Sequence, residues 1–215
     1  MPEQTNRGKK IRCSKCGAQY YDLGRKKAPC PSCNRASLIK AGTLAEVSLR
    51  LIKGSYNDPR QGWTDGWVTQ NSAGAAYLNC EFEITAGPFA GKKFRGLIGL
   101  HTPKGAWWGE KGRQTIREIL NSAHNLSNED YSPDAIETRL LSGLGQLNGL
   151  AFAAEIGLGK GPNGLEKNEI SAVITPDDER YSSVERAKAL SEPAPHRPSK
   201  AEDTFSNRPI WMSKV

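Results

Sequence analysis

Alternating apolar and polar positions predict five β-strands in the middle of the chain. The clearest pattern lies at residues 76–85, where Leu78, Cys80, Phe82 and Ile84 occupy every second position. The same period, interrupted by turns rich in Gly and Pro, predicts four further strands, at residues 44–53, 92–100, 150–158 and 165–174. The large apolar residues that we assign to the core are Phe82, Ile84, Phe89 and Phe152. We expect Cys80 to be an inert buried thiol.

Two helices are predicted after the third strand. Apolar residues recur at helical spacing within residues 109–123 and predict a helix there. Ser132 followed by Pro133 predicts the start of a second helix, which runs to about residue 141. Residues 54–75 are rich in Gly, Asn, Asp, Ser and Gln, and this composition predicts a long loop.

The resulting order, β-β-β-α-β-β, is that of an OB-fold, a five-stranded Greek-key barrel. We therefore expect a mainly β fold, with an OB-like domain at residues 44–175 and a helical insertion between its third and fourth strands. Two helices in place of one leave a generic α+β sheet open. An α/β nucleotide-binding fold is excluded, because strands and helices do not alternate throughout. In an OB barrel, residues 54–75 and 159–164 would be loops of the kind that contact oligonucleotides.

Four of the five cysteines form two C-x2-C pairs, thirteen residues apart. They are Cys13, Cys16, Cys30 and Cys33. Two tight turns, each presenting two thiolates, supply the tetrahedral shell of a structural zinc ion. The spacing predicts a zinc ribbon at residues 9–36, with a hairpin inside residues 17–29 that turns at Asp22-Leu23-Gly24. The alternatives are two disulfides, which need an oxidising compartment, and redox motifs, which occur singly in a βαβ context.

The formal net charge of +7 is concentrated near the N-terminus. Residues 1–40 contain ten basic and two acidic residues, so the remainder of the chain is slightly acidic. Basic patches bind phosphate without sequence selectivity, and we expect Arg25, Lys26 and Lys27 of the ribbon to contact nucleic acid. The alternative is a protein-interaction ribbon whose lysines are simply solvated.

Two resemblances extend this interpretation. Residues Tyr20–Lys26, followed by Pro29-Cys30-Pro31, resemble small zinc-ribbon proteins of bacteria. Residues 44–175 resemble a family of phage proteins related to single-stranded-DNA-binding proteins. The matching segments are Tyr77–Ile84, Gly87–Phe94, Ile98–Leu100, Gly112–Arg117 and Leu147–Phe152. The second resemblance implies an OB-like barrel and a role in phage DNA replication or recombination.

Basic residues and tryptophans are interleaved in the region where a single strand is expected to bind. The candidate nucleic-acid-binding residues of this domain are Lys92, Lys93, Arg95, Lys104, Trp107, Trp108, Lys111, Arg113, Arg117, Trp63 and Trp67. Single strands are bound by cations that follow the backbone and by aromatic rings that stack on bases. Trp107-Trp108 is expected in a loop, and Trp63 and Trp67 in the loop 54–75. For each tryptophan, a place in the core is the alternative.

No catalytic motif is found: there is no P-loop, no H-E-x-x-H and no nucleophile elbow. No apolar stretch is long enough to span a membrane, and no export signal is present, so we expect a cytoplasmic protein. Residues 176–215 are polar and proline-rich, and predict a disordered tail. The apolar tip, Pro209, Ile210, Trp211 and Met212, is predicted to dock on a replication or recombination protein. The alternatives are a frayed end and a tail that folds back on the barrel.

Together, these patterns favour a non-enzymatic protein that binds single-stranded nucleic acid, with DNA favoured over RNA, in phage or bacterial replication or recombination. It would contain one structural zinc ion. The second hypothesis is an adaptor, in which ribbon and tail bind replication or transcription proteins and the barrel is a scaffold. The sequence does not indicate an oligomeric state.

Overall fold

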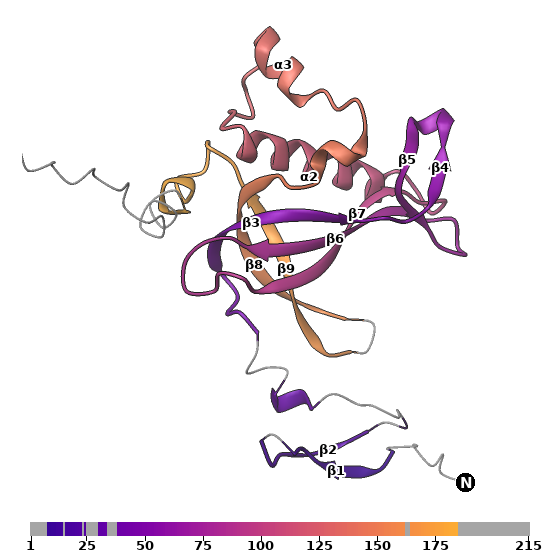
Figure 1. Cartoon of the computed structure of the whole chain (residues 1–215), viewed down its shortest axis with the longest axis vertical. Helices are drawn as coiled ribbons and strands as arrows, with labels where there is room; N and C mark the ends of the chain where they lie inside the picture. The colour runs from indigo at the N-terminus through magenta and orange to yellow at the C-terminus, as the bar shows by residue number, and fades with distance from the viewer. Residues whose placement is uncertain are drawn as a thin grey trace, which may run out of the picture.

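The computed structural model describes residues 8–14, 16–22, 24, 30–33, 38–161 and 164–184, and among these the chain is mainly β (Figure 1). Arg25, Lys26, Lys27 and the apolar tip at residues 209–212 lie outside the described residues. A small N-terminal unit and a larger sheet with two helices are present. The mainly β character and the four-cysteine cluster near the N-terminus agree with the prediction.

In the described part of the chain, one sheet of two strands belongs to the small unit, and the main sheet has seven strands. The elements of the small unit are β1 (Lys10–Arg12) and β2 (Gln19–Tyr21). The strands of the main sheet are β3 (Thr43–Ile52), β4 (Tyr56–Asp58), β5 (Trp63–Gln70), β6 (Ala76–Ile84), β7 (Lys93–His101), β8 (Ala151–Lys160) and β9 (Glu166–Ile174). The helices are α2 (Trp107–Ala123) and α3 (Pro133–Arg139), with two 3-10 turns, η1 (Pro59–Gln61) and η2 (Leu144–Leu147).

The main sheet is antiparallel and is centred on β3. The first half of β3 pairs with β8 and its second half pairs with β6. The strand order is β4-β5-β6-β3-β8-β9, and β7 pairs with the other side of β6. Among the described residues, no ladder joins β7 to β9, so the closure that a barrel requires is not found.

The predicted loop at residues 54–75 is wrong. It contains β4, η1 and β5, which form a hairpin that projects from the sheet in Figure 1. Strand β5 was not predicted because its sequence does not alternate between apolar and polar residues. Only Val68 of this strand is buried. Gly54 lies against β5, where a Cβ would meet the carbonyl oxygen of Val68 at 2.3 Å. Trp63 and Trp67 are therefore strand residues.

Helix α2 begins at Trp107, two residues earlier than predicted, so Trp107 and Trp108 are helical and not in a loop. The helix packs closely against the end of β7. A Cβ on Gly112 would lie 1.6 Å from the carbonyl oxygen of Gly99, and one on Gly109 would lie 2.5 Å from that of Leu100. These two glycines let the helix backbone contact the strand directly.

The core lies between the sheet and α2. Every second residue of β6 is buried, as predicted, and Phe152 and Ile84 join Phe82 there. Phe89 is only partly buried, because it lies in the turn after β6 and packs on the edge of this core. Burial raises the pKa of the Cys80 thiol to about 12, which keeps it neutral. No helix in the described part of the chain has the length and apolar character needed to cross a membrane.

Candidate metal centre and nucleic-acid interface

The first pair of cysteines lies in the turn between β1 and β2. Ile11 pairs with Tyr20, and the turn is closed by hydrogen bonds from the Gly17 amide to the Cys13 carbonyl and from the Cys13 amide to Ala18, both 2.9 Å. Gly17 has a φ of +73°, which favours glycine. A hairpin thus spans residues 10–21, and the turn that carries Cys13 and Cys16 is the turn of this hairpin. Much of the predicted hairpin at residues 17–29 lies outside the described residues.

The four predicted ligands come together. The sulfurs of Cys13, Cys16, Cys30 and Cys33 all lie within 4.8 Å of one another. Cys13 and Cys33 are 3.6 Å apart, as are Cys16 and Cys30. A disulfide needs about 2.05 Å, so these are free thiols. Hydrogen bonds with the thiols of Cys16 and Cys13 raise the pKa of Cys33 to about 12. Four sulfurs this close together form a cluster that could hold a metal cation.

The segment that follows the cysteines is anchored to the main sheet. The buried side chain of Asn168, on β9, accepts from the Ile39 amide and donates to the Ile39 carbonyl, both at 2.9 Å. The Asn168 amide also donates to the Gly157 carbonyl at 3.3 Å. Ile39 itself is buried in the main core. The chain is therefore fixed to the sheet only six residues after Cys33.

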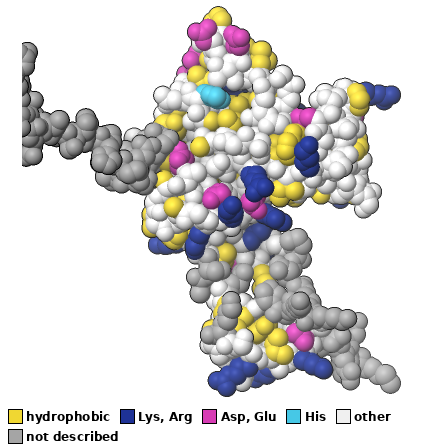
Figure 2. All heavy atoms as spheres, in the orientation of Figure 1, with side chains coloured by type: hydrophobic (Ala, Val, Ile, Leu, Met, Phe, Trp, Pro, Cys, Tyr) yellow, Lys and Arg dark blue, Asp and Glu magenta, His cyan; other side chains and the backbone are white. Residues whose placement is uncertain are grey.

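The second candidate site is the outer face of the main sheet, defined here as the side chains of β3, β6 and β7 that point away from the core. Glu81 on β6 lies between Arg50 on β3 and Arg95 on β7, at 3.9 and 3.5 Å. Beside it, Lys93 pairs with Glu83 at 2.9 Å. Figure 2 shows basic and acidic side chains interleaved on this part of the surface. The carboxylates thus offset part of the basic charge that the sequence suggested.

One hollow of about 520 Å³ lies beside these charges, at the base of the β4–β5 hairpin. We call it the Trp67 hollow. It is lined by Arg50, Lys53, Trp67, Arg95 and Asn148, among others. The Lys53 ammonium lies 5.0 Å from the centre of the Trp67 ring, within the range of a cation–π interaction. An aromatic ring and three cations are therefore gathered at one place.

A second hollow, of about 420 Å³, lies at the start of α2, and we call it the Trp107 hollow. Lys104, Trp107 and Trp108 line it. The Trp107 side chain is 73% exposed. Trp108 covers Gly99 of β7 and contacts the Tyr77 ring edge-on, with centroids 6.2 Å apart. Because Tyr77 belongs to β6, this hollow is at one end of the outer face.

Trp63 lines a third and smaller hollow of about 260 Å³ with Tyr56 and His101. Its ring centre lies 6.5 Å from that of Tyr56, and it packs partly on the core. The alternative of a core position is therefore partly correct for Trp63 and for Trp67, which also packs on the core, but not for exposed Trp107.

The predicted basic residues do not form one groove. Lys93 and Arg95 lie on the outer face and Lys104 in the Trp107 hollow, but the others are dispersed. Lys92 lies over the ring of Phe89, and Lys111 lines a different groove beside β9. Arg113 is exposed on α2. Arg117 packs on the ring of Tyr131 and donates a hydrogen bond to the Asn128 carbonyl. These basic residues are close together in the sequence, but they lie on a strand, in a loop and on several sides of a helix. The fold therefore separates their side chains in space.

Two cations that line the Trp67 hollow are not among the candidate binding residues predicted from the sequence. Arg50 and Lys53 lie in or directly after β3, far in sequence from the basic run. Arg50 stands directly opposite Glu81 in the ladder. The sequence does indicate that Arg50 faces away from the core, because Arg50 is a polar residue between Leu49 and Leu51, which are both buried. Only the strand pairing shows that it joins Arg95.

Comparison with known proteins gives one match. Residues 1–52 match the model of a family described as "Protein of unknown function (FYDLN_acid)". The matched segment includes all four clustered cysteines and ends at the last residue of β3. No curated protein and no solved structure matches the chain.

Proposed function

We propose that this protein binds single-stranded nucleic acid across the outer face of β3, β6 and β7, and that its four cysteines hold a structural zinc ion. The observation that carries the proposal is the position of the two hollows. Tyr77, beside the Trp107 hollow, and Glu81, which lines the Trp67 hollow, are four residues apart on β6, or about 13 Å. An exposed tryptophan and a basic cluster are therefore within reach of one bound strand.

The pairing of the strands supports an OB-like interpretation. In an OB-fold the first strand pairs with the second and fourth, the third with the second, and the fifth with the fourth. β3, β6, β7, β8 and β9 pair in this way. The face made by the second and third strands, together with the loop between the first two, is where OB-folds bind oligonucleotides. Here that loop is the β4–β5 hairpin, which carries Trp67.

The chemistry of this face suits a strand rather than a duplex. Stacking on an exposed ring contributes about 1–3 kcal/mol per base and does not depend on sequence. Arg50, Lys53, Lys93 and Arg95 exceed Glu81 and Glu83 by two positive charges, which gives a modest phosphate attraction. The resemblance to phage single-strand-binding proteins favours DNA.

Titration of the intrinsic tryptophan fluorescence with oligo-dT, at two or more salt concentrations, tests the proposal. Arg95→Ala should reduce the slope of log K against log salt by about 0.7, because one phosphate contact is lost. Trp107→Ala should weaken binding by about 10- to 100-fold and leave that slope unchanged. Lys111→Ala is the matched control, since Lys111 lies off the outer face.

Absence of binding to oligo-dT at low salt would overturn this assignment. So would a Lys111→Ala variant as defective as Arg95→Ala, because the outer face would then not be the site. Parallel titration with oligo-rU separates DNA from RNA preference.

Zinc is proposed from the sulfur geometry. Tetrahedral Zn²⁺ with Zn–S bonds of about 2.3 Å places sulfurs about 3.8 Å apart, close to the 3.6 Å of the two short pairs. With four thiolates the shell is closed, so the ion has a structural role and no open position for catalysis. Elemental analysis of purified protein should give about one zinc per chain. Cys16→Ser should lose it and Cys80→Ser should keep it, because Cys80 is in the main core.

A further inference from the structure

Asn148 lines the Trp67 hollow, and the fold determines how its side-chain amide is oriented. The Leu51 backbone amide donates a hydrogen bond of 2.8 Å to the Asn148 side-chain oxygen. Because a backbone N–H only donates, the oxygen and not the nitrogen of this side chain faces Leu51. The NH2 group, which also only donates, is therefore the polar group that Asn148 presents to a ligand in the hollow.

The backbone around Asn148 is fixed from both sides. The Asn148 amide donates to the Gly145 carbonyl at 3.0 Å, at the end of η2. The following residue, Gly149, donates to the Leu49 carbonyl at 2.7 Å, and the Leu49 amide donates to the Leu150 carbonyl at 2.8 Å. These bonds extend the pairing of β8 along β3. The donor of Asn148 is therefore held in place before any ligand arrives, as a specific contact requires.

The turn η2 also positions the Trp67 ring. The Gly145 amide donates to the Asp65 carboxylate at 3.0 Å, which ties η2 to β5. A Cβ on Gly145 would lie 2.6 Å from Nε1 of Trp67, so the edge of the indole lies against the turn. The Lys53 ammonium lies 5.0 Å from the centre of the ring, and both residues line the hollow. An aromatic ring and an amide donor are thus held at one place by the same turn.

The other polar side chains of the hollow restrict what can lie beside Asn148. Arg50, Lys53 and Arg95 only donate. Glu81 is the carboxylate of this lining, and it lies between Arg50 and Arg95 at 3.9 and 3.5 Å. It belongs to β6, on the opposite side of β3 from Asn148, and two strand spacings are about 9.6 Å. A ligand atom that contacts the Asn148 amide must therefore be a hydrogen-bond acceptor.

The hollow suits a base better than a phosphate. The ring of Trp67 provides a surface on which a base can stack. The carboxylate of Glu81 repels a phosphate within the hollow, whereas the side chains of Arg50 and Arg95 are 73% and 74% exposed and accessible to phosphates outside it. The edge of a base, and not the backbone of the strand, is therefore expected to meet Asn148.

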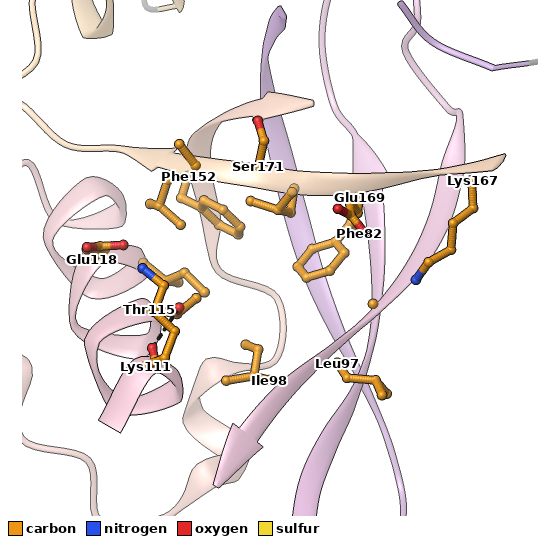
Figure 3. Close-up of a pocket in the computed structure, with 15 residues that line it drawn as sticks. Phe82, Leu97, Ile98, Lys111, Thr115, Glu118, Phe152, Lys167, Glu169 and Ser171 are labelled. Carbon is orange, nitrogen blue, oxygen red and sulfur yellow. Dashed lines mark hydrogen bonds between the residues drawn. The ribbon is translucent and has the colours of Figure 1, made fainter. Parts of the chain in front are cut away.

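The groove between β7 and β9, shown in Figure 3, lacks this combination among the described residues that line it. Its volume is also about 520 Å³, but its aromatic residues, Phe82 and Phe152, are only 4% and 2% exposed. A base has no exposed ring face to stack on there. The size of a cavity is therefore not what makes the Trp67 hollow the candidate.

We infer that the Trp67 hollow takes a base with a carbonyl oxygen on its Watson–Crick edge, which stacks on Trp67 and accepts a hydrogen bond from Asn148. This inference rests on the proposed function and adds the kind of base that the site prefers. Thymine and cytosine are the sharpest comparison, because they have rings of the same size, and where thymine carries the O4 oxygen cytosine carries an amino group. An amino group opposite the Asn148 NH2 would leave two donors without an acceptor.

Fluorescence titration with oligo-dT, oligo-dU and oligo-dC of equal length, at one salt concentration, tests this inference. We expect oligo-dT and oligo-dU to bind about 3- to 10-fold more tightly than oligo-dC, because one neutral hydrogen bond separates them. Asn148→Asp keeps an oxygen for the Leu51 amide and replaces the donor by an acceptor. The ratio should then invert, with oligo-dC bound more tightly than oligo-dT, although the added negative charge weakens the binding of both.

Asn125→Asp is the matched control, since it makes the same change at an exposed position in the turn after α2, and it should leave the ratio unchanged. Equal binding of oligo-dT and oligo-dC by the unaltered protein would overturn the inference and leave the proposed function standing. So would an Asn148→Asp variant that weakens both equally, because Asn148 would then contact a phosphate. Absence of binding to all three oligonucleotides would instead overturn the proposed function, and this inference with it.

Discussion

The two β regions of this protein are held together by different forces. Every second side chain of β6 in the main sheet is buried, and a continuous core extends to β3, β8 and α2. In contrast, neither β1 nor β2 contains a buried residue, and Cys30 is the one buried hydrophobic residue among those described before residue 34. The large sheet is stabilised by removing apolar surface from water, and the small hairpin must depend on its four sulfurs.

Because the two regions are stabilised differently, we expect them to tolerate different changes. A short hairpin without an apolar core cannot offset the conformational entropy that it loses on folding. A cation held by both cysteine pairs would replace the missing core. The main sheet has a core of its own and should tolerate loss of a metal, but its close backbone contacts leave little room for added volume.

The largest effect is expected from removing the metal. Treatment with a strong chelator, or Cys16→Ser, should unfold the N-terminal hairpin completely, because structural zinc supplies the folding free energy of such units. The expected readout is amide exchange at residues 10–12 and 19–21 at the rate of an unstructured peptide. Protection of β3 and β6 should not change. A hairpin that keeps its protection without metal would show that the sulfurs are not what holds it.

The same contrast explains what the sequence could predict. The cysteine cluster was predictable because two short turns place the ligands, and each turn is determined by neighbouring residues. Strand β6 was predictable for a similar reason, because its alternating burial follows the alternation of apolar and polar residues in its own sequence. These features are local, so a single sequence contains their full signal.

The features that the sequence did not predict depend on contacts between segments that are distant in the chain. Strand β5 is mostly polar and forms because it pairs with β4 and β6, which no local pattern reveals. The start of α2 at Trp107 depends on how Gly109 and Gly112 contact β7. The dispersal of the basic run and the gap between β7 and β9 likewise follow from the assembled sheet.

The next largest effect is expected from adding one methyl group between α2 and β7. In Gly112→Ala the new Cβ would lie 1.6 Å from the Gly99 carbonyl oxygen, so the helix must move. We expect the free energy of unfolding of the main domain to fall by about 3 kcal/mol, measured by urea denaturation. The zinc content should not change. Alanine is a better helix former than glycine by about 1 kcal/mol, so any loss reports the close contact.

Gln114→Ala provides the control on the same helix, because Gln114 is exposed and its side chain donates a hydrogen bond to Glu118 on the helix surface. Its effect should stay within about 0.5 kcal/mol. If Gly112→Ala were as stable as this control, the contact between α2 and β7 would be adaptable, and the contrast with the hairpin that carries the cysteines would weaken.

The smallest effect is expected at the link between the two regions. Asn168→Ala removes both hydrogen bonds to the Ile39 backbone and leaves a buried amide and carbonyl without those partners. Each unsatisfied group costs about 1–3 kcal/mol, but water can enter once the segment loosens, so we expect a loss of about 2 kcal/mol.

The distinguishing result for Asn168→Ala is where the loss appears. Amide exchange should rise at residues 38–40, whereas the hairpin at residues 10–21 and strand β6 should keep their protection, because neither depends on this link. Lys167→Ala, one residue earlier on β9, is the matched control and should leave residues 38–40 unchanged. If Asn168→Ala also released the hairpin or the zinc, the two regions would fold as one cooperative unit, and the separation between metal and core would be wrong.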